Sequence, residues 1–221
     1  MPKEVNQITR EIVKNHLEKI SNFKDVYDLF KLLNYPDEII YPSPTRRKKD
    51  SFNFKKEDQD RIKEVYSIIS IGEGLSKGDN LQVFFLECNS TSARFTRDVT
   101  KKLAESYRSL LVIFTDNYDN IVFILPENVK EGDVFKLKLT RLHTFKSDLY
   151  YTDIDIISRL VYEQENNWRF IFKKWKDAFS VERVQDTFFE DYKKVFFKVR
   201  DYLREQKVPK KESHEFTLQL L

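Results

Sequence analysis

Apolar residues at helical spacing occur mainly toward the two ends of the chain. In residues 4–20 and 25–33 they recur every three or four positions, which predicts two amphipathic helices. From Tyr151 onward the spacing is helical again, and Thr152 followed by Asp155 indicates a capped helix start. A long helix with a broad aromatic stripe is predicted over residues 181–206. We therefore expect helices at both ends of the protein.

The middle of the chain has the pattern of a β-sheet. Apolar or alternating runs bounded by turn residues predict five strands, at residues 64–71, 81–87, 110–115, 120–125 and 134–142. The first two should pair antiparallel, and an amphipathic helix is predicted between the second and third, at residues 94–108. In the fifth strand Phe135, Leu137 and Leu139 alternate with polar residues, so these side chains are expected on a buried face.

These elements predict an α+β fold in which a central mixed β-sheet is flanked by N-terminal and C-terminal helices. We expect a helical segment with a basic loop over residues 1–50, an α+β core over 51–150 and a helical connector over 151–221. Residues 41–51, with two prolines and four consecutive basic residues, are predicted to form an exposed loop.

Composition excludes several classes of protein. The 221 residues include 19 Phe and 11 Tyr, which is enough to build a core, and only four Gly, so disordered and collagen-like chains are excluded. No apolar run approaches the roughly 20 residues of a membrane-spanning helix, and the N-terminus lacks the apolar stretch of a signal peptide. Cys88 is the single cysteine, so no internal disulfide can form, and we expect it to be buried or half-buried in a strand. A cytoplasmic protein without a membrane partner is expected.

Two acidic residues form a candidate metal site. Asp79 precedes an apolar strand and Glu87 ends it, and in nucleases with a restriction-endonuclease-like core such acids hold Mg²⁺. These nucleases place a lysine two residues after the second acid, where this chain has Asn89. We therefore expect no catalytic residues and no metal ligands in this region, with Mg²⁺ binding only if the nuclease interpretation holds.

Basic residues give the main indication of a polyanion partner. The formal net charge is only +3, from 39 Lys and Arg against 36 Asp and Glu, so local clusters matter more than the total. The predicted nucleic-acid-binding residues are Arg46, Arg47, Lys48, Lys49, Arg94, Arg97 and Lys101. Asp98 and Glu105 lie on the same helical face as the last three, so a solvated face with Arg94–Asp98 and Lys101–Glu105 pairs is the alternative interpretation.

Several segments, taken in chain order, resemble the N-terminal region of type IIG-like restriction–modification and phage-defence proteins. In that family a helical, nuclease-like region precedes an adenine-specific DNA methyltransferase. The resemblance is carried by the segments LFKLLNY at 29–35, LQVFFLE at 81–87, ARFTR at 93–97, LLVIFT at 110–115, DLYYTDIDIISRL at 148–160 and VERVQDTFFEDYKKVFF at 181–197.

This resemblance implies a restriction-endonuclease-like core and a methyltransferase domain further along the same, longer chain. The family's nuclease acids would correspond to Asp79 and Glu87. S-adenosylmethionine would bind in the methyltransferase part, because the glycine-containing cofactor motif and the Asn-Pro-Pro-Tyr-like motif do not occur here. The apolar ending of residues 216–221 also favours a chain that continues.

The sequence therefore predicts a region that contacts double-stranded DNA or docks on the methyltransferase part, without catalysis of its own. Two alternatives stay open. One is an active Mg²⁺-dependent DNA endonuclease domain that uses Asp79 and Glu87. The other is a protein-interaction module whose aromatic helix at 181–206 packs against a partner.

Overall fold

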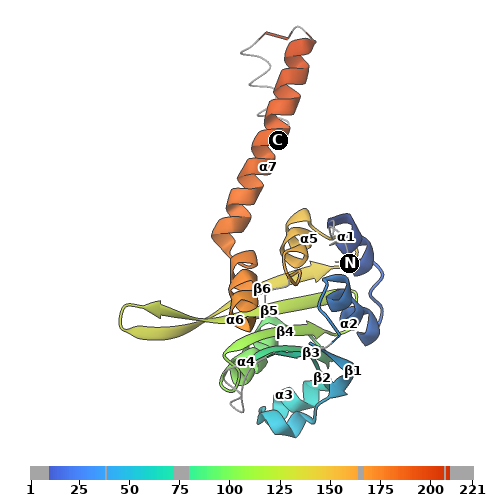
Figure 1. Ribbon diagram of the computed structural model, residues 1–221, viewed down its shortest axis with the longest axis vertical. Helices are drawn as coiled ribbons and strands as arrows, with labels where there is room; N and C mark the ends of the chain where they lie inside the picture. The colour runs from blue at the N-terminus through green and yellow to red at the C-terminus, as the bar shows by residue number, and fades with distance from the viewer. Residues whose placement is uncertain (1–9, 38, 72–79, 164–166, 207, 210–221) are drawn as a thin grey trace. The chain divides into compact units, whose positions relative to one another are not determined.

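The sheet is built from strands that are neighbours in the sequence. A computed structural model describes residues 10–37, 39–71, 80–163, 167–206 and 208–209, with the backbone alone at 41–44 and 181–191. Six strands pair in the order β1-β2-β3-β4-β5-β6 (Figure 1). Their bounds are β1 Ile40–Arg46, β2 Ile62–Ile71, β3 Leu81–Cys88, β4 Ser109–Thr115, β5 Asn120–Glu131 and β6 Val134–Phe145.

All neighbouring strands are antiparallel except β3 and β4. These two run parallel because α4 (Ala93–Ala104) carries the chain back across the sheet between them. The α+β class and the central mixed sheet flanked by helices are thus confirmed.

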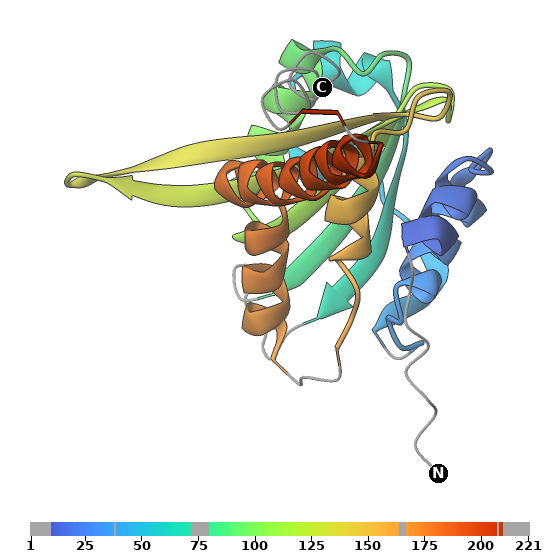
Figure 2. The ribbon, with the colours of Figure 1, turned by 90° about the horizontal axis from the view of Figure 1, so that it is seen from above.

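Helices cover both faces of the sheet. Figure 2 shows α4 and α3 on one face and α1, α2, α5 and α6 on the other. The bounds are α1 Arg10–Leu17, α2 Phe23–Leu32, α3 Lys56–Arg61, α5 Tyr151–Ser158 and α6 Trp168–Ala178, with a short 3₁₀ helix at Lys49–Phe52. The face under α4 is filled by side chains at alternate strand positions, among them Phe84, Leu86, Val112 and Phe114.

The opposite face is closed by an aromatic contact between distant parts of the chain. Trp175 of α6 is fully buried, and its Nε1 donates a hydrogen bond to the Tyr35 hydroxyl over 2.9 Å. That hydroxyl donates in turn to the carbonyl oxygen of Leu160 over 2.8 Å. The pKa of Tyr35 is raised far above its usual value, mainly by burial. This chain of bonds fixes α6 to the end of α2.

Residues 41–51 were predicted as an exposed loop; the loop assignment is wrong for residues 41–46, whereas Arg46, Arg47 and Lys48 are exposed as expected. β1 covers most of this segment and pairs with β2, with a register shift between Ile40 and Thr45. Prolines are compatible with a strand at the sheet edge, where one row of N–H groups has no ladder partner. Pro42 and Pro44 fall within the shifted stretch, so the proline signal marked an edge strand.

The helix that starts near Thr152 lacks the predicted cap. The N-cap residue of α5 is Tyr150, which makes no side-chain capping bond, and Thr152 lies inside the helix. Asp155 is a buried ion-pair partner: its carboxylate accepts from Arg10 Nε over 2.6 Å and pairs with Arg159 over 2.7 Å. The predicted cap was inferred from neighbouring residues alone, whereas the partner of Asp155 is Arg10, 145 residues away in the sequence.

The β5–β6 hairpin extends well past the rest of the sheet. β4 pairs with β5 only from Thr115 to Val112, opposite Ile121 to Ile124, so residues 126–139 form a projecting arm (Figures 1 and 2). Gly132, with a φ of +62°, is at its tip. Phe135 was expected to be buried but is 69% exposed, because no element covers this part of the hairpin among the residues that the structure describes. That expectation is wrong.

The chain forms two compact units, Met1–Phe179 and Ser180–Leu221. The second contains α7, Val181–Glu205, which agrees with the predicted long helix. Within α7 Phe196 is buried, while Val195, Phe197 and Tyr202 are exposed.

Candidate nucleic-acid interface

Helix α4 presents three of the predicted basic residues on one exposed face. Phe95, Thr96, Val99, Thr100 and Leu103 form the buried side of α4, so the opposite side of the helix faces solvent. The Arg94 side chain is 88% exposed and that of Arg97 is 53% exposed. Lys101, one turn further along the helix, is also exposed. The structure therefore brings Arg94, Arg97 and Lys101 together.

A carboxylate lies within this basic face. Asp98 is 3.2 Å from Arg97 Nε and 3.9 Å from Arg94 Nε, so the Arg94–Asp98 pair of the alternative interpretation is present. Glu105 pairs with Lys102 over 2.5 Å, and not with Lys101 as that interpretation had it. Lys101 has no carboxylate within 4 Å among the described residues, and its ammonium group is available to an anion.

The surface between α3 and α4 is hollowed into two adjoining concavities of about 120 and 300 Å³. Their basic lining residues come from both sides and include Lys55, Arg61, Arg94, Lys101 and Lys102. Asp58 and Asp98 line both concavities. Burial, followed by the negative charge of Asp98, raises the pKa of Asp58, while Lys55 and Arg61 oppose that shift. Glu57 and Glu105 each line one of the two concavities, so five basic residues face four carboxylates and the groove is only slightly basic.

The four consecutive basic residues at 46–49 do not form one patch. Arg46 ends β1 and forms an ion pair with Glu64 on β2. Arg47 is directed to Ser67, whose Oγ accepts from its Nε over 3.0 Å. Lys49 donates through Nζ to the carbonyl oxygens of Ile62, over 2.7 Å, and Gln59, over 3.3 Å.

The four residues lie in different local structures, because β1 ends at Arg46 and a 3₁₀ helix begins at Lys49. Lys48 is exposed, and its side chain has no partner within the described parts of the chain. Nucleic-acid binding by Arg46, Arg47, Lys48 and Lys49 stays a prediction, with Lys48 the freest of the four.

Glu87 lies at the end of β3 next to a carboxylate that sequence analysis missed. Glu64 is its register partner on β2, and Lys63 is the extra residue at the neighbouring irregularity of the ladder. Burial first and the charge of Glu64 second raise the pKa of Glu87, and Lys63 partly offsets them. No sequence signal identified Glu64, because the register that brings it to Glu87 depends on this irregularity.

Tyr118 is the second neighbour of Glu87. Its backbone has a φ of +64°, a left-handed conformation that is uncommon for a large side chain. Its N–H donates to Thr115 Oγ1 over 2.8 Å, and its hydroxyl donates to the Glu87 carboxylate. The β4–β5 turn thereby places a phenol over the end of β3.

The other half of the predicted acidic pair, Asp79, lies outside the described residues. β3 runs about 20 Å from Leu81 to Glu87, at ~3.3 Å per residue. The carboxylate that the described structure brings to Glu87 is Glu64, at the opposite end of β3 from Leu81. In the described part of the chain, no group of three or more His, Cys, Asp and Glu side chains is arranged to hold a metal ion.

Cys88, next to Glu87, is fully buried, and its expected place in a strand is confirmed. Burial raises the pKa of its thiol to about 12, so the sulfur stays protonated at neutral pH.

A polar network joins the β3–α4 loop, the β4–β5 turn and strands β5 and β6. Asn120 Nδ2 donates to Thr91 Oγ1 over 2.9 Å and its Oδ1 meets His143 Nε2, while Thr91 Oγ1 donates to Asp116 over 3.2 Å. Arg141 donates to the Thr91 carbonyl oxygen over 2.9 Å. Burial, then Arg141, lowers the pKa of His143, and Asp116 opposes them. Because these bonds hold two loops to two strands, we assign the network a structural role.

Comparison of the chain with models of known protein families, with curated proteins and with solved structures finds no match. Within the described residues no helix is both long and apolar enough to cross a membrane. The placement and charge of the chain's own side chains are therefore what indicates its function.

Proposed function

We propose that this chain is the DNA-contacting region of a restriction–modification or phage-defence methyltransferase protein. It contacts the phosphates of double-stranded DNA through α4, and Lys55 and Arg61 approach the same groove from the side of α3. The observation that supports this most directly is the exposed row of Arg94, Arg97 and Lys101 on one helix. Arg and Lys contacts of this kind position a protein on duplex DNA without reading its sequence.

The strand connections support a restriction-endonuclease-like core as part of this proposal. An antiparallel β2–β3 hairpin is followed by α4 and by β4 parallel to β3. An acid ends β3, as in the nucleases that the sequence resembles, and Asn89 replaces their lysine. The methyltransferase domain, with its S-adenosylmethionine, would be the partner in the same longer chain.

Duplex binding is tested by fluorescence anisotropy with a labelled duplex at low salt. The triple variant Arg94→Ala/Arg97→Ala/Lys101→Ala should weaken binding about tenfold, at about 0.5 kcal/mol per surface contact. It should also reduce the slope of log K against log salt by about 3, because fewer counterions are released.

The matched control is Lys14→Ala/Lys24→Ala/Lys31→Ala, which removes three exposed lysines from α1 and α2. This control should bind DNA as the unmodified protein does. No binding by the unmodified protein, or an equal loss in both triple variants, would contradict the proposal.

A second candidate function, Mg²⁺-dependent cleavage, is favoured by one observation, the register pair of Glu64 and Glu87. Carboxylates paired in this way can hold a divalent cation. In this structure Arg46 pairs with Glu64 and Tyr118 donates to Glu87, so a cation would have to displace the guanidinium.

Plasmid nicking with Mg²⁺ or Mn²⁺ tests this second function. If the pair is catalytic, Glu64→Gln and Glu87→Gln should each abolish nicking by the protein. Our main proposal expects no nicking at all, and nicking that survives both substitutions would come from a contaminating nuclease.

A further inference from the structure

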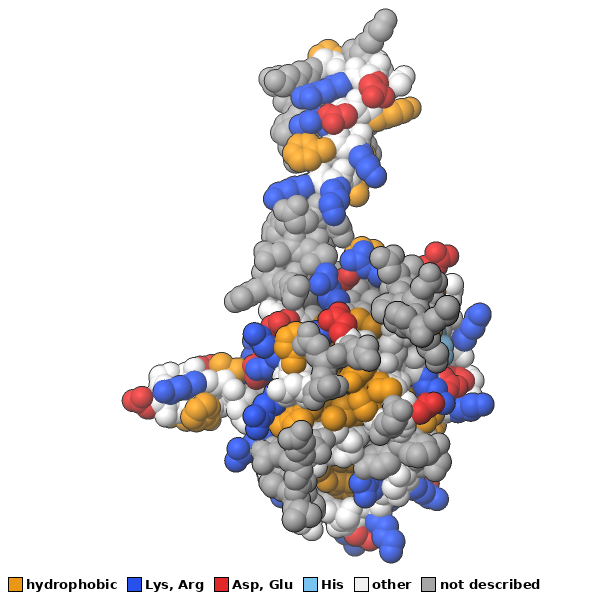
Figure 3. Space-filling view, in the orientation of Figure 1, with side chains coloured by type: hydrophobic (Ala, Val, Ile, Leu, Met, Phe, Trp, Pro, Cys, Tyr) orange, Lys and Arg blue, Asp and Glu red, His pale blue; other side chains and the backbone are white. Residues whose placement is uncertain are grey.

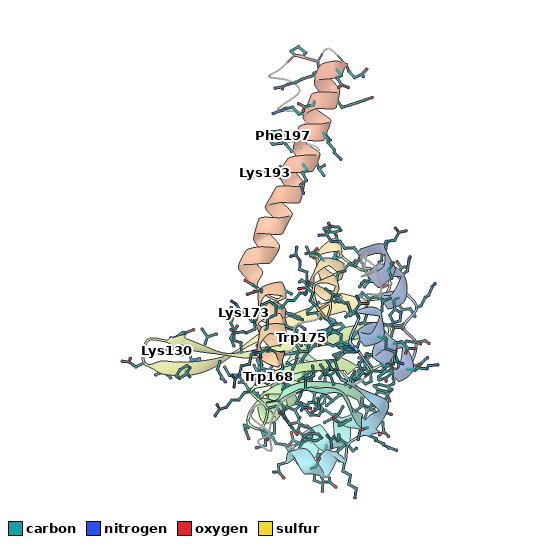
Figure 4. All side chains as sticks on the ribbon, viewed as in Figure 1. Lys130, Trp168, Lys173, Trp175, Lys193 and Phe197 are labelled. Carbon is teal, nitrogen blue, oxygen red and sulfur yellow. The ribbon has the colours of Figure 1, made fainter. Side chains whose placement is uncertain are left out.

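The outer face of α6 combines aromatic rings with basic groups. Ile171, Trp175 and Ala178 are buried, which accounts for the hydrophobic side of the helix. On its other side Phe170 is 42% exposed. Trp168, at the start of α6, is partly buried (Figure 4).

Basic side chains lie against the aromatic rings of this helix. The Arg169 guanidinium is 5.2 Å from the centre of the Trp168 ring, and Lys176 Nζ is 5.7 Å from the centre of the Phe172 ring. Residues 169, 172, 173 and 176 share one side of a helix at 3.6 residues per turn. The row spans about 10 Å, the length of about three stacked nucleotides.

This row faces the base of the β5–β6 arm. Lys176 pairs with Glu127 of β5 over 3.0 Å, and Lys138 is the register partner of Glu127 on β6. Figure 3 shows basic side chains gathered where the arm leaves the body of the protein. Helix and hairpin thus contribute cations to one surface. We call it the α6–arm surface, and it consists of Arg169, Phe170, Lys173 and Lys176 of α6 with Lys138 of β6.

The charge of the α6–arm surface is only partly neutralised. Lys174 forms an ion pair with Glu163 over 2.6 Å, and Lys176 forms one with Glu127. Arg169, Lys173 and Lys138 have no carboxylate within 4 Å in the described parts of the chain. Three cations therefore remain available to an anionic partner beside an exposed ring.

We propose that the α6–arm surface binds single-stranded nucleic acid. Bases stack on Phe170, and phosphates contact Arg169, Lys173 and Lys138. Single strands offer free base faces for such rings, whereas a duplex keeps its bases stacked inside and offers phosphates alone. The site lies on the opposite face of the sheet from α4 and does not depend on the proposed duplex contact (Figure 2).

Anisotropy with a labelled oligodeoxythymidine of about 16 nucleotides, and with a duplex of equal length, tests the proposal on the full chain. Phe170→Leu keeps an apolar side chain but removes the ring, and it should weaken single-strand binding at least about fivefold. Phe170→Trp should restore it. Arg169→Ala/Lys173→Ala should weaken single-strand binding and reduce its salt dependence, and neither change should affect the duplex.

Phe145→Leu is the matched control, because Phe145 is 43% exposed, as Phe170 is, but lies at the far end of β6. It should bind the single strand normally. The proposal is overturned if the unmodified protein does not bind the oligonucleotide. It is also overturned if Phe170→Leu binds normally, or if Phe145→Leu loses as much affinity, in which case the rings serve folding or a protein partner. Loss of duplex binding in the α4 variant alone would leave this site intact, so the two proposals fail separately.

Discussion

Single carboxylates determine what the candidate surfaces can bind. Asp98 holds Arg94 and Arg97, so both arginines must exchange that carboxylate for phosphate when DNA binds. Exposed pairs of this kind contribute only about 0–1 kcal/mol, so the exchange has a small cost. The i, i+4 pair was predictable because a helix fixes that spacing. Glu64 was not, because its contact with Glu87 depends on the ladder register.

Asp153 is a carboxylate that the fold accommodates poorly. It is 8% exposed, and its Oδ2 has no hydrogen-bond partner among the described residues. Burial raises its pKa above the usual value of 3.8, and Asp148 adds to that shift, while bonds from Tyr150 and Thr152 oppose it. A raised pKa in the folded state means that ionisation destabilises the fold.

We therefore predict that Asp153→Asn stabilises the protein at neutral pH. The amide keeps an acceptor for the Tyr150 N–H but carries no charge, and we expect a rise in Tm of about 2–4 °C, corresponding to ~1 kcal/mol. Because the free energy of unfolding of the unmodified protein falls as pH rises from about 4 through the raised pKa, the difference should vanish below pH ~4. Thermal unfolding followed by circular dichroism at several pH values measures it, and a difference independent of pH would contradict the cause we assign.

At the scale of elements, local patterns predicted most of the helices and strands. β2, β3, β4 and α4 follow the predicted apolar runs within one or two residues at most ends, although α4 ends at Ala104, four residues before its predicted end. β1 was missed because its prolines are tolerated only at a sheet edge, which is a tertiary property. The outward extension of β5 and β6 was missed because partly polar residues continue the ladder as far as Glu131 and Val134.

Helix α2 begins with a capping box, in which Asn22 and Asp25 bond to each other's backbone N–H. The Asn22 side chain accepts from the Asp25 N–H over 3.3 Å, and Asp25 Oδ2 accepts from the Asn22 N–H over 3.2 Å. Burial alone would raise the pKa of Asp25, but bonds from Ser21 and Asn22 outweigh it and lower that pKa.

We predict that Asn22→Ala lowers the free energy of unfolding by about 1 kcal/mol, because the N–H of Asp25 loses the side-chain acceptor of Asn22. Asn22→Ser preserves an acceptor and should behave almost as the unmodified protein does. Urea unfolding with an unchanged m-value measures the difference, and equal midpoints for the two variants would show that the cap contributes nothing.

At the scale of the whole molecule, the protein places its two candidate surfaces on opposite faces of one sheet. The sequence predicted the α+β class and the basic residues of α4. It could not predict which faces α4 and α6 cover, because that depends on the pairing of β3 with β4 and on the bond between Trp175 and Tyr35. The α6–arm surface therefore emerged only from the fold.

The first unit should fold without the second. We predict that a chain ending at Phe179 unfolds cooperatively, with a Tm within a few degrees of that of the full chain. A chain ending at Asn167 loses Trp175 together with the buried Ile171, Ala178 and Phe179, and should be destabilised by more than the ~3–5 kcal/mol that emptying a Trp site alone costs. Thermal unfolding measures both, and equal stability of the two truncations would contradict the role of α6.

The order of the strands also sets the order of assembly during synthesis. Each strand pairs with the one made just before it, so the sheet can grow from the ribosome without waiting for distant segments. Trp175 is different, since its partner Tyr35 was made 140 residues earlier. Until α6 emerges, the apolar face of β3 and β4 that it covers is open to water. The nascent chain is then at its most vulnerable to aggregation, and the emergence of residues 168–178 from the ribosome ends that interval.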